Sequence, residues 1–428
     1  MTVRPGKAPS NRSWRACSSS LAALAVALSS ASAVAAGFDT PILYTARHQA
    51  MGGTAIASVD DASAGFHNPA GLQGVRGLGF IGDFSLILGK VQATPDRDPS
   101  AASLESKTVL APFFLLGGAY RAHKWLTVGL AGFPVASGGA EYSYKLGAAP
   151  TIDKTEIVFF EATPMLSLNV PKDRWLPGVL AFGAGYRASL VMFDRLKGNV
   201  ANPQLLDLKL RGYNWTGFRV GAQYQPIEAL KFGVVFRNKV VVTTKADSGR
   251  VFAAEATDGE LDFTLPAKLG FGVRFDRGHF GVGSDLEWAF QSQNKRPPLK
   301  GTRDGMNLEV PNVFDWQNGV TWRIGAEYRL GQAPSIPLRL GYIHDTKVTN
   351  KQYPSAFGTP PAPTHTLTAG AGYVEEHWQV NVAATRRFGS THINDDDLGT
   401  GCAFCGFAGD YAITMTGLYV DASVDLPM

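Results

Sequence analysis

Cys402 and Cys405 form a C-x-x-C pair, a spacing that suggests redox chemistry when it occurs in a cytosolic α/β protein. Here the pair lies in a Gly-rich stretch, and no matching His or Cys cluster accompanies it, so a zinc site is not predicted. The third cysteine, Cys17, lies in a segment that we predict is removed on export. In an exported chain we interpret Cys402 and Cys405 as a disulfide at a loop tip, with two free thiols as the alternative.

Other groupings of reactive side chains are sparse. A hydrolase needs Ser, His and an orienting acid brought together. The spacing of His279, Asp285 and Glu287 places them on one inward face, but no Gly-x-Ser-x-Gly motif accompanies them. The eight histidines are scattered, and the acidic run at 395–397 suits either a Ca²⁺ site or a solvated loop. We therefore predict no enzyme, no cofactor and no metal.

The first 36 residues form a targeting segment. Its apolar core, from Leu21 to Leu28, follows four basic residues and precedes small residues that end in Ala33-Val34-Ala35. This is the pattern of a cleaved secretory signal peptide, and a buried core helix is the weaker alternative. Removing those four from the 40 basic residues leaves 36, which equals the number of acidic residues. A mature charge near zero gives no support for a nucleic-acid partner.

Composition limits the fold class. The 428 residues are 45% hydrophobic but only 18% charged, and they include 48 glycines. There is enough apolar surface to exclude disorder, yet no run reaches the ~18 uninterrupted apolar residues of a membrane helix. Hydrophobicity spread in short pieces, together with many glycines and aromatic residues, favours β structure.

From about residue 75 onward, apolar and polar residues alternate with a period of two. Between 261 and 275 every odd position is apolar, which predicts one long strand with a single apolar face. A strand of a soluble sandwich is usually ~5–6 residues long, whereas a tilted membrane strand needs ~9–11. The same pattern predicts strands at 76–91, 107–121, 124–136, 156–170, 178–191, 208–224, 230–243, 260–275, 279–291, 313–329, 336–347, 365–374, 377–388 and 410–425.

The predicted links between these strands alternate in length. Links after odd-numbered strands span roughly 15–21 residues, and those after even-numbered strands are turns of about 2–7. Long loops on one side and tight turns on the other are typical of outer-membrane barrels. We therefore predict an all-β fold, a transmembrane antiparallel β-barrel of about 14 strands over residues 75–428.

A barrel of this size has a lumen that its own inward side chains cannot fill. Residues 37–74 precede the first strand, lack its alternation and are rich in Gly, Ala, Ser and Asp. We predict that this segment is a hatch that lies inside the lumen. An open porin has no need for such a segment.

The predicted hatch contains four short motifs: Gly37-Phe38, Met51-Gly52-Gly53, Asp60-Asp61-Ala62-Ser63 and His67-Asn68-Pro69-Ala70-Gly71-Leu72. These motifs resemble the hatch of a known family, the FadL/TodX-type outer-membrane transporters of fatty acids and hydrocarbons. The resemblance continues through residues 129–134, which look like the family's kinked third strand, and through the Leu-Pro hairpin around 265–288. It spans nearly the whole mature chain.

The resemblance implies a monomeric barrel in the outer membrane, in contact with its lipid and lipopolysaccharide. A hydrophobic ligand, a long-chain fatty acid or an aromatic hydrocarbon, would be held in an apolar lumen pocket. It would leave sideways through a gap beside the kinked strand, at Gly132, Phe133 and Pro134. Phe133 would line that gap, with a lipid-facing anchor as the alternative. A general porin, a structural barrel or a lipid-modifying enzyme are the alternative functions.

Two further expectations concern the interior. Asn68, Pro69 and Ala70 are predicted to anchor the hatch inside the barrel, because Pro69 gives a rigid turn and the Asn68 amide both donates and accepts hydrogen bonds. Lys268 is predicted to face Glu287 across a hairpin whose register sets Phe275 opposite Phe280, so that both charges point into the lumen.

Overall fold

The computed structural model describes residues 43–96, 104–146, 149–199, 202–332, 334–354, 361–399 and 408–427. The predicted signal peptide and the pair Cys402 and Cys405 lie outside the described residues. None of the helices among the described residues is long and apolar enough to cross a membrane.

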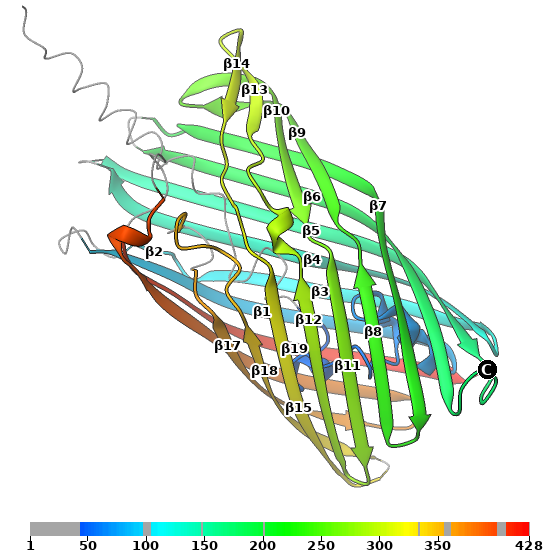
Figure 1. Ribbon diagram of the computed structural model, residues 1–428. Helices are drawn as coiled ribbons and strands as arrows, with labels where there is room; N and C mark the ends of the chain where they lie inside the picture. The colour runs from blue at the N-terminus through cyan, green and yellow to red at the C-terminus, as the bar shows by residue number, and fades with distance from the viewer. Residues whose placement is uncertain are drawn as a thin grey trace, which may run out of the picture.

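The described residues form a closed antiparallel β-barrel of 14 membrane strands, which confirms the predicted fold class (Figure 1). The barrel closes where β1 pairs with β19, from Gly77 opposite Pro427 to Pro95 opposite Gly409. Four of the membrane strands are each divided in two, as β8 with β9, β10 with β11, β12 with β13, and β14 with β15.

The strands have the following bounds: β1 Gly77–Pro95, β2 Leu104–Glu105, β3 Val109–His123, β4 Leu126–Leu146, β5 Ala149–Val170, β6 Val179–Asn199, β7 Leu206–Ile227, β8 Leu230–Arg237, β9 Val240–Val251, β10 Ala254–Leu265, β11 Lys268–Arg277, β12 Phe280–Ala289, β13 Leu299–Arg303, β14 Met306–Val310, β15 Gly319–Leu330, β16 Ile336–Asp345, β17 Thr364–Val374, β18 Trp378–Ile393 and β19 Gly409–Pro427. The short helices are α2 Ala46–Gln49, η1 Ala62–Gly65, η2 Pro69–Gly74, η3 Gln291–Gln293 and η4 Asp395–Asp397.

Several strands are longer than the sequence pattern predicts. β4 extends to Leu146 and β5 starts at Ala149, so the predicted long link 137–155 is mostly strand. The β6–β7, β9–β10 and β13–β14 pairs extend in the same way, and the β13–β14 hairpin projects beyond the barrel at one end (Figure 1). Above the membrane the outward side chains face water and not lipid, so they can be polar. The extensions therefore lack the lipid-facing apolar residues that identified the membrane part in the sequence.

The apolar run 261–275 is not one face of one strand, as predicted, because it divides at Pro266-Ala267. Leu261 and Phe263 in β10 are buried at 4% and 1% exposure, whereas Phe271 and Phe275 in β11 are 50% and 46% exposed on the outside. Both sets are odd-numbered, so the break between the two strands inverts the faces. The same inversion occurs between β8 and β9.

The β11–β12 hairpin differs by two residues from the predicted register. Arg277 pairs with Phe280 around a two-residue turn, which places Phe275 opposite Val282 and Lys268 opposite Ala289. The predicted turn was too long, because Gly278 adopts φ +60° and allows a tight hairpin. A shift of two residues keeps every side chain on its predicted face.

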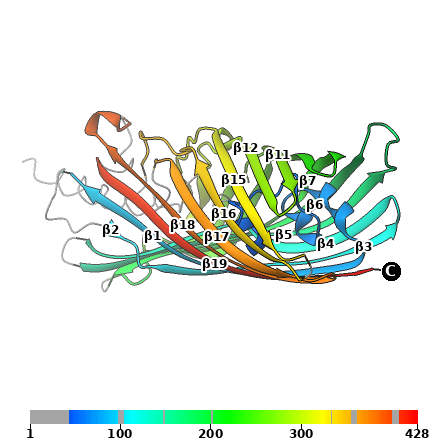
Figure 2. The same ribbon diagram turned by 90° about the horizontal axis from the view of Figure 1, so that it is seen from below.

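The N-terminal segment, described from residue 43, lies within the barrel and packs against the inner side of the wall (Figures 1 and 2). Its short helices contact β1, β3 to β7 and β17 to β19. Most of its residues are buried. We call the end of the barrel that carries the tight turns and the C-terminus the periplasmic end.

Candidate functional site

The wall of the barrel has a window between β3 and β4. These strands pair only from His123 opposite Leu126 to Leu116 opposite Gly132. Above Gly132, β4 continues along β5, and β3 continues along β1. Residues 109–115 and 133–140, which flank this window, therefore have no backbone pairing with each other among the described contacts.

The window closes again above, at Lys107 and Glu141. The Lys107 backbone N–H donates to the Glu141 carbonyl at 2.8 Å, and the two side chains form an ion pair at 2.5 Å. Lipid normally forbids an interruption in a hydrogen-bonded wall, because unpaired backbone groups are costly there. Because backbone hydrogen bonds join the two chain segments both below and above this interruption, it is a specific feature of the fold.

β4 bends at the lower edge of the window. The register with β5 shifts between Pro134 and Ala136, which leaves Val135 as an extra residue, as in a β-bulge. Pro134 has no N–H to pair with, so it suits this position. All four residues from Phe133 to Ala136 are buried, although a regular strand exposes every second residue. The strand therefore turns toward the lumen here.

Phe133 faces the hatch, so the alternative of a lipid-facing anchor is wrong. Its side chain is fully buried, and its ring lies 5.3 Å from Phe66 and 6.1 Å from Tyr44, centroid to centroid. The Tyr44 hydroxyl donates to the Pro134 carbonyl at 2.9 Å. The hatch thus seals the inner side of the window through an aromatic cluster, which we call the inner stopper: Tyr44, Phe66 and Phe133.

Asn68 lies fully buried where the hatch touches β7 and β8. Its Nδ2 donates to three carbonyl oxygens, those of Ile56 at 2.8 Å, Ala222 at 3.2 Å and Val234 at 3.3 Å. Its Oδ1 accepts from the Ala70 N–H at 3.2 Å, which caps η2. The amide therefore connects one hatch loop to another and to two wall strands.

His67, next to Asn68, adds no charge to this contact. Burial lowers the pKa of His67 to about 3, so the imidazole is neutral at physiological pH. It contacts the Tyr44 carbonyl, and its ring lies 5.0 Å from His48.

Replacing Asn68 with alanine is expected to loosen the hatch while the barrel stays folded. Each lost hydrogen bond is worth about 0.5–1.5 kcal/mol, and the wall carbonyls are left without their donor. Limited proteolysis within residues 43–74 should become faster, and hydrophobic uptake should fall. The matched control is Asn307→Ala at the exposed tip of β14. Unchanged protection together with unchanged uptake would contradict the anchor role.

Three wall carboxylates hold the hatch backbone. Asp285 Oδ2 accepts from the N–H groups of Ala55 and Ile56 at 2.8 and 3.0 Å. Asp83 Oδ2 accepts from the Ala46 N–H at 3.1 Å, and Asp421 Oδ2 accepts from that of Arg47 at 2.7 Å. These roles leave no signal in the sequence, because an inward-facing acidic residue has the same strand pattern whether it contacts water or a hatch.

Two glycines of the wall also allow the hatch to pack closely against it. A Cβ at Gly183 would lie 2.1 Å from the Ala70 nitrogen, and one at Gly221 would lie 2.2 Å from Asn68 Oδ1. Both positions allow the close approach that the Asn68 contacts need. Among 48 glycines, no sequence signal distinguishes these two.

A belt of inward charges surrounds the hatch on the extracellular side. Lys268 Nζ lies 2.9 Å from Glu287 Oε1, and Arg323 Nη2 lies 3.4 Å from the same oxygen. Both Lys268 and Glu287 thus point inward, although they are diagonal and not directly opposite. The belt consists of Glu161, Arg187, Arg219, Arg237, Lys268, Glu287 and Arg323.

The most deeply buried ion pair of this belt lies beside the bend in β4. Glu161 on β5 is the direct partner of Phe133, and its Oε1 accepts from Arg187 Nε and Nη2 at 2.9 and 2.5 Å. Arg187 Nη1 donates to the Asn238 carbonyl at 2.8 Å, at the break between β8 and β9. Both side chains of the pair are fully buried.

Above this belt the inner faces of β7, β9 and β10 are mainly apolar, whereas β5 and β6 carry a buried ion pair between Asp153 and Arg195. On β9, Val240 and Val242 are fully buried inside, whereas Thr243 and Lys245 face outward and are exposed. This is the reverse of β11, where Arg274 points inward and Phe271 outward. The inward residues form what we call the apolar funnel: Phe159, Val191, Phe193, Leu206, Leu208, Leu210, Val240, Val242, Val251, Leu261, Phe263, Leu265 and Leu299.

The funnel and the inner stopper belong to one continuous apolar cluster. Phe263 lies 5.1 Å from Phe193 and 6.0 Å from Phe159, centroid to centroid. Phe159 is in turn the β5 partner of Ala136, at the bend in β4. Apolar side chains therefore connect the extracellular half of the lumen to the window.

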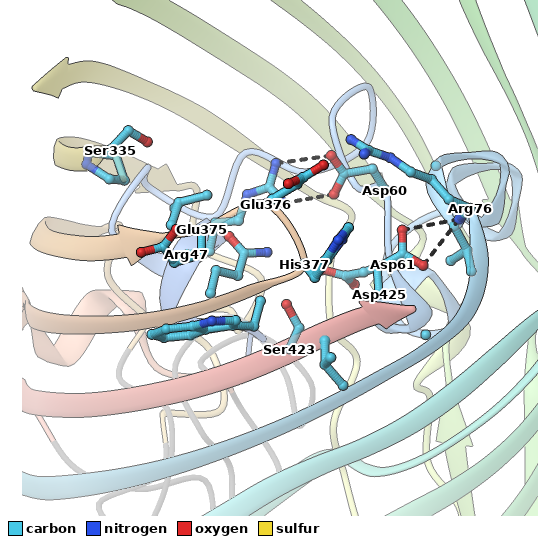
Figure 3. A pocket seen from close by; sticks show the side chains of 18 of the residues that line it. Arg47, Asp60, Asp61, Arg76, Ser335, Glu375, Glu376, His377, Ser423 and Asp425 are labelled. Atoms are coloured by element: carbon cyan, nitrogen blue, oxygen red, sulfur yellow. Dashed lines mark hydrogen bonds and ion pairs between the residues drawn. The ribbon is translucent and has the colours of Figure 1, made fainter. Parts of the chain in front are cut away.

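The periplasmic side of the hatch is polar instead. A cavity of about 300 Å³ opens there between the hatch, the β17–β18 turn and the end of β19 (Figure 3). Arg47 Nη1 lies 2.6 Å from Asp60 Oδ1 within it. A neighbouring cavity of about 260 Å³ is lined by Glu327 with Arg274, Arg329 and Arg339.

The grouping that suggested an enzyme does not assemble. His279 lies exposed in the β11–β12 turn, with Nδ1 2.8 Å from the Arg329 carbonyl oxygen, so it does not share the inward face of Asp285 and Glu287 as predicted. The predicted alternation had assumed that the strand starts at 279, whereas β12 starts at Phe280. Within the described residues, no group of three His, Cys, Asp or Glu side chains could hold a metal ion.

A 14-stranded barrel with an internal hatch and a bent third strand defines a class of outer-membrane transport barrel. Residues 26–404 match the family model described as outer membrane protein transport protein (OMPP1/FadL/TodX). The chain belongs to this family, which confirms the resemblance of its motifs and places it in the outer membrane. As a member of a transport family it is not an enzyme.

Solved structures show the same fold. A Pseudomonas aeruginosa FadL homologue is 15% identical with a TM-score of 0.69, over 91% of this chain and 100% of that chain. The P. putida toluene transporter TodX is 15% identical with a TM-score of 0.67, over 90% and 99%. The Ralstonia pickettii toluene transporter TbuX is 15% identical with a TM-score of 0.61, over 90% and 98%. No curated protein matches the sequence.

Proposed function

We propose that this protein conducts long-chain fatty acids or aromatic hydrocarbons passively across the outer membrane, and releases them sideways through the window beside β4. The ligand enters the apolar funnel from outside and moves toward the bend at Phe133. Displacement of the inner stopper then gives it access to the lipid.

The reversal of polarity along the inner face supports this proposal most directly. Within the membrane the wall is charged inside and apolar outside, whereas above it β7, β9 and β10 have mainly apolar inner faces and mainly polar outer faces. A water-filled pore has no use for an apolar inner face at its entrance. For an acyl chain, each buried methylene is stabilised by about 0.8 kcal/mol, so the funnel selects hydrophobic molecules.

The charges around and below the hatch favour a sideways exit. A ligand that continued through the lumen would cross the belt and then the Arg47–Asp60 and Glu327 ion pairs. Those groups are hydrated or paired, and an apolar ligand offers them no hydrogen bonds in exchange. The window instead leads from apolar side chains directly to hydrocarbon.

Analysis of co-purified ligand and conductance together test the proposal against the porin alternative. We expect mass spectrometry of the gently purified protein to detect fatty acids or other apolar molecules at near-stoichiometric amounts. We expect planar bilayers to show no steady open conductance, because the hatch occupies the lumen. A stable aqueous conductance with no retained apolar ligand would identify a porin and contradict the proposal.

A further inference from the structure

Phe114 and Phe160 lie on the lipid side of the wall at the height of the bend. Continuing the β3–β4 register beyond its last pair places Phe114 in one row with Pro134, and Pro134 pairs with Phe160 on β5. The two phenylalanines are thus on strands that flank β4 on either side. Phe114 is 42% exposed to the surroundings of the barrel.

The two rings meet across the strand that separates them. Neighbouring strands lie about 4.8 Å apart, so side chains two strands apart start about 9–10 Å from each other. The ring centroids of Phe114 and Phe160 are nevertheless only 6.2 Å apart. They lean together over Pro134, because β4 has turned inward and presents no bulky side chain between them.

The contacts of Gly132 support the same arrangement. A Cβ at Gly132 would lie 3.3 Å from Phe160 Cζ, so this ring also covers the outer side of β4 below Pro134. Pro134 alternates with the inward Phe133 and pairs with the outward Phe160, yet it is buried. Cover on the lipid side accounts for the burial of Pro134.

We propose that Phe114 and Phe160 form an outer shutter, a lipid-side closure of the window that a leaving ligand must part and that sets the bulk of the molecules released. This inference rests on the proposed lateral exit. The window then has two closures: the inner stopper is held by the hatch, and the shutter depends only on the wall. Displacing the hatch alone leaves the exit covered.

A reversible cross-link tests the shutter. Phe114→Cys with Phe160→Cys, in a background where Cys402 and Cys405 are serine, would be bridged by a bifunctional methanethiosulfonate. A direct disulfide cannot span strands that are about 9–10 Å apart. We expect the bridge to reduce uptake of labelled palmitate by several fold, and dithiothreitol to restore it. Full uptake with the bridge in place would overturn the proposal.

A matched pair on regularly paired strands controls for the chemistry. Phe218 on β7 and Phe236 on β8 also have ring centroids 6.2 Å apart on the lipid side. Bridging Phe218→Cys and Phe236→Cys should leave uptake unchanged. An equal loss in the control would assign the effect to stiffening of the barrel and overturn the shutter.

Removing the two phenylalanine rings provides an independent test of the shutter. Phe114→Ala with Phe160→Ala should raise uptake of a bulky pyrene-labelled fatty acid by several fold, relative to palmitate. An unchanged ratio would overturn the size-setting role. A variant with a regular third strand, described in the Discussion, distinguishes the two proposals. If it blocks uptake while the cross-link does not, the lateral exit stands and the shutter fails; if it transports normally, the lateral exit itself fails.

Discussion

Replacing Arg187 with methionine is expected to destabilise the barrel by about 3–5 kcal/mol, because Glu161 would keep its buried charge without its main partner. Arg187 supplies two hydrogen bonds to Glu161 and a third to the carbonyl of Asn238. Arg219 Nη2 lies 3.7 Å from the other Glu161 oxygen and compensates only in part. Because Glu161 is the strand partner of Phe133, the bend in β4 should loosen as well.

Thermal unfolding in detergent measures this effect. Glu161→Gln combined with Arg187→Met should recover much of the loss, since the orphaned charge is then removed. Arg211→Met is the matched control, because its pair with Asp194 also joins two neighbouring strands, β7 and β6, but is 41% and 43% exposed. Such an exposed pair contributes about 0–1 kcal/mol. Equal destabilisation by Arg187→Met and Arg211→Met would contradict the role assigned to the buried pair.

The membrane part of this fold could be predicted from the sequence, because lipid outside and polar groups inside impose a strict period of two. The extracellular part could not. The run 261–275 keeps its odd-numbered apolar residues through the break at Pro266-Ala267, so periodicity alone does not show that the faces invert. The extended hairpins were likewise interpreted as loops, because their outward faces are as polar as loop residues.

The candidate site was predictable where local chemistry has few alternatives. Pro134 among glycines indicated a bend, and the side chain of Asn68 indicated an anchor for the hatch. The partners of the anchor were not predictable, because they are backbone carbonyls of β7 and β8 and a close approach at Gly183. Such contacts depend on how a separate segment packs in the lumen, and a single strand pattern contains no information about that packing.

A third strand made regular is expected to abolish hydrophobic uptake. The variant deletes Val135, the extra residue of the bulge, and carries Pro134→Val, Gly138→Thr and Gly139→Thr. Pro134→Val restores the missing N–H donor, the three substitutions add β-branched side chains, and the deletion removes the bulge, so β4 can pair with β3 throughout. The ligand would then reach the bend and find a continuous wall. The barrel should remain folded and at least as heat-stable, because the added pairing removes unpaired backbone from the membrane.

A control variant separates the closure of the window from the loss of a proline. Pro164→Val lies on β5, where the chain is exposed to lipid and pairs with Leu130 below the window. It makes the same Pro-to-Val change on the neighbouring strand and does not affect the window. Uptake should be unchanged.

Uptake of labelled palmitate and ethylbenzene, in cells lacking other carriers for these compounds, tests the lateral exit most directly. Native protein, the regular-strand variant and Pro164→Val would be compared at equal outer-membrane levels, with heat-modifiable migration to verify folding. The proposed path predicts uptake by the native and Pro164→Val proteins, and background uptake by the folded regular-strand variant. Full uptake by the regular-strand variant would show that the ligand continues through the lumen past the hatch, and the lateral exit would then be wrong.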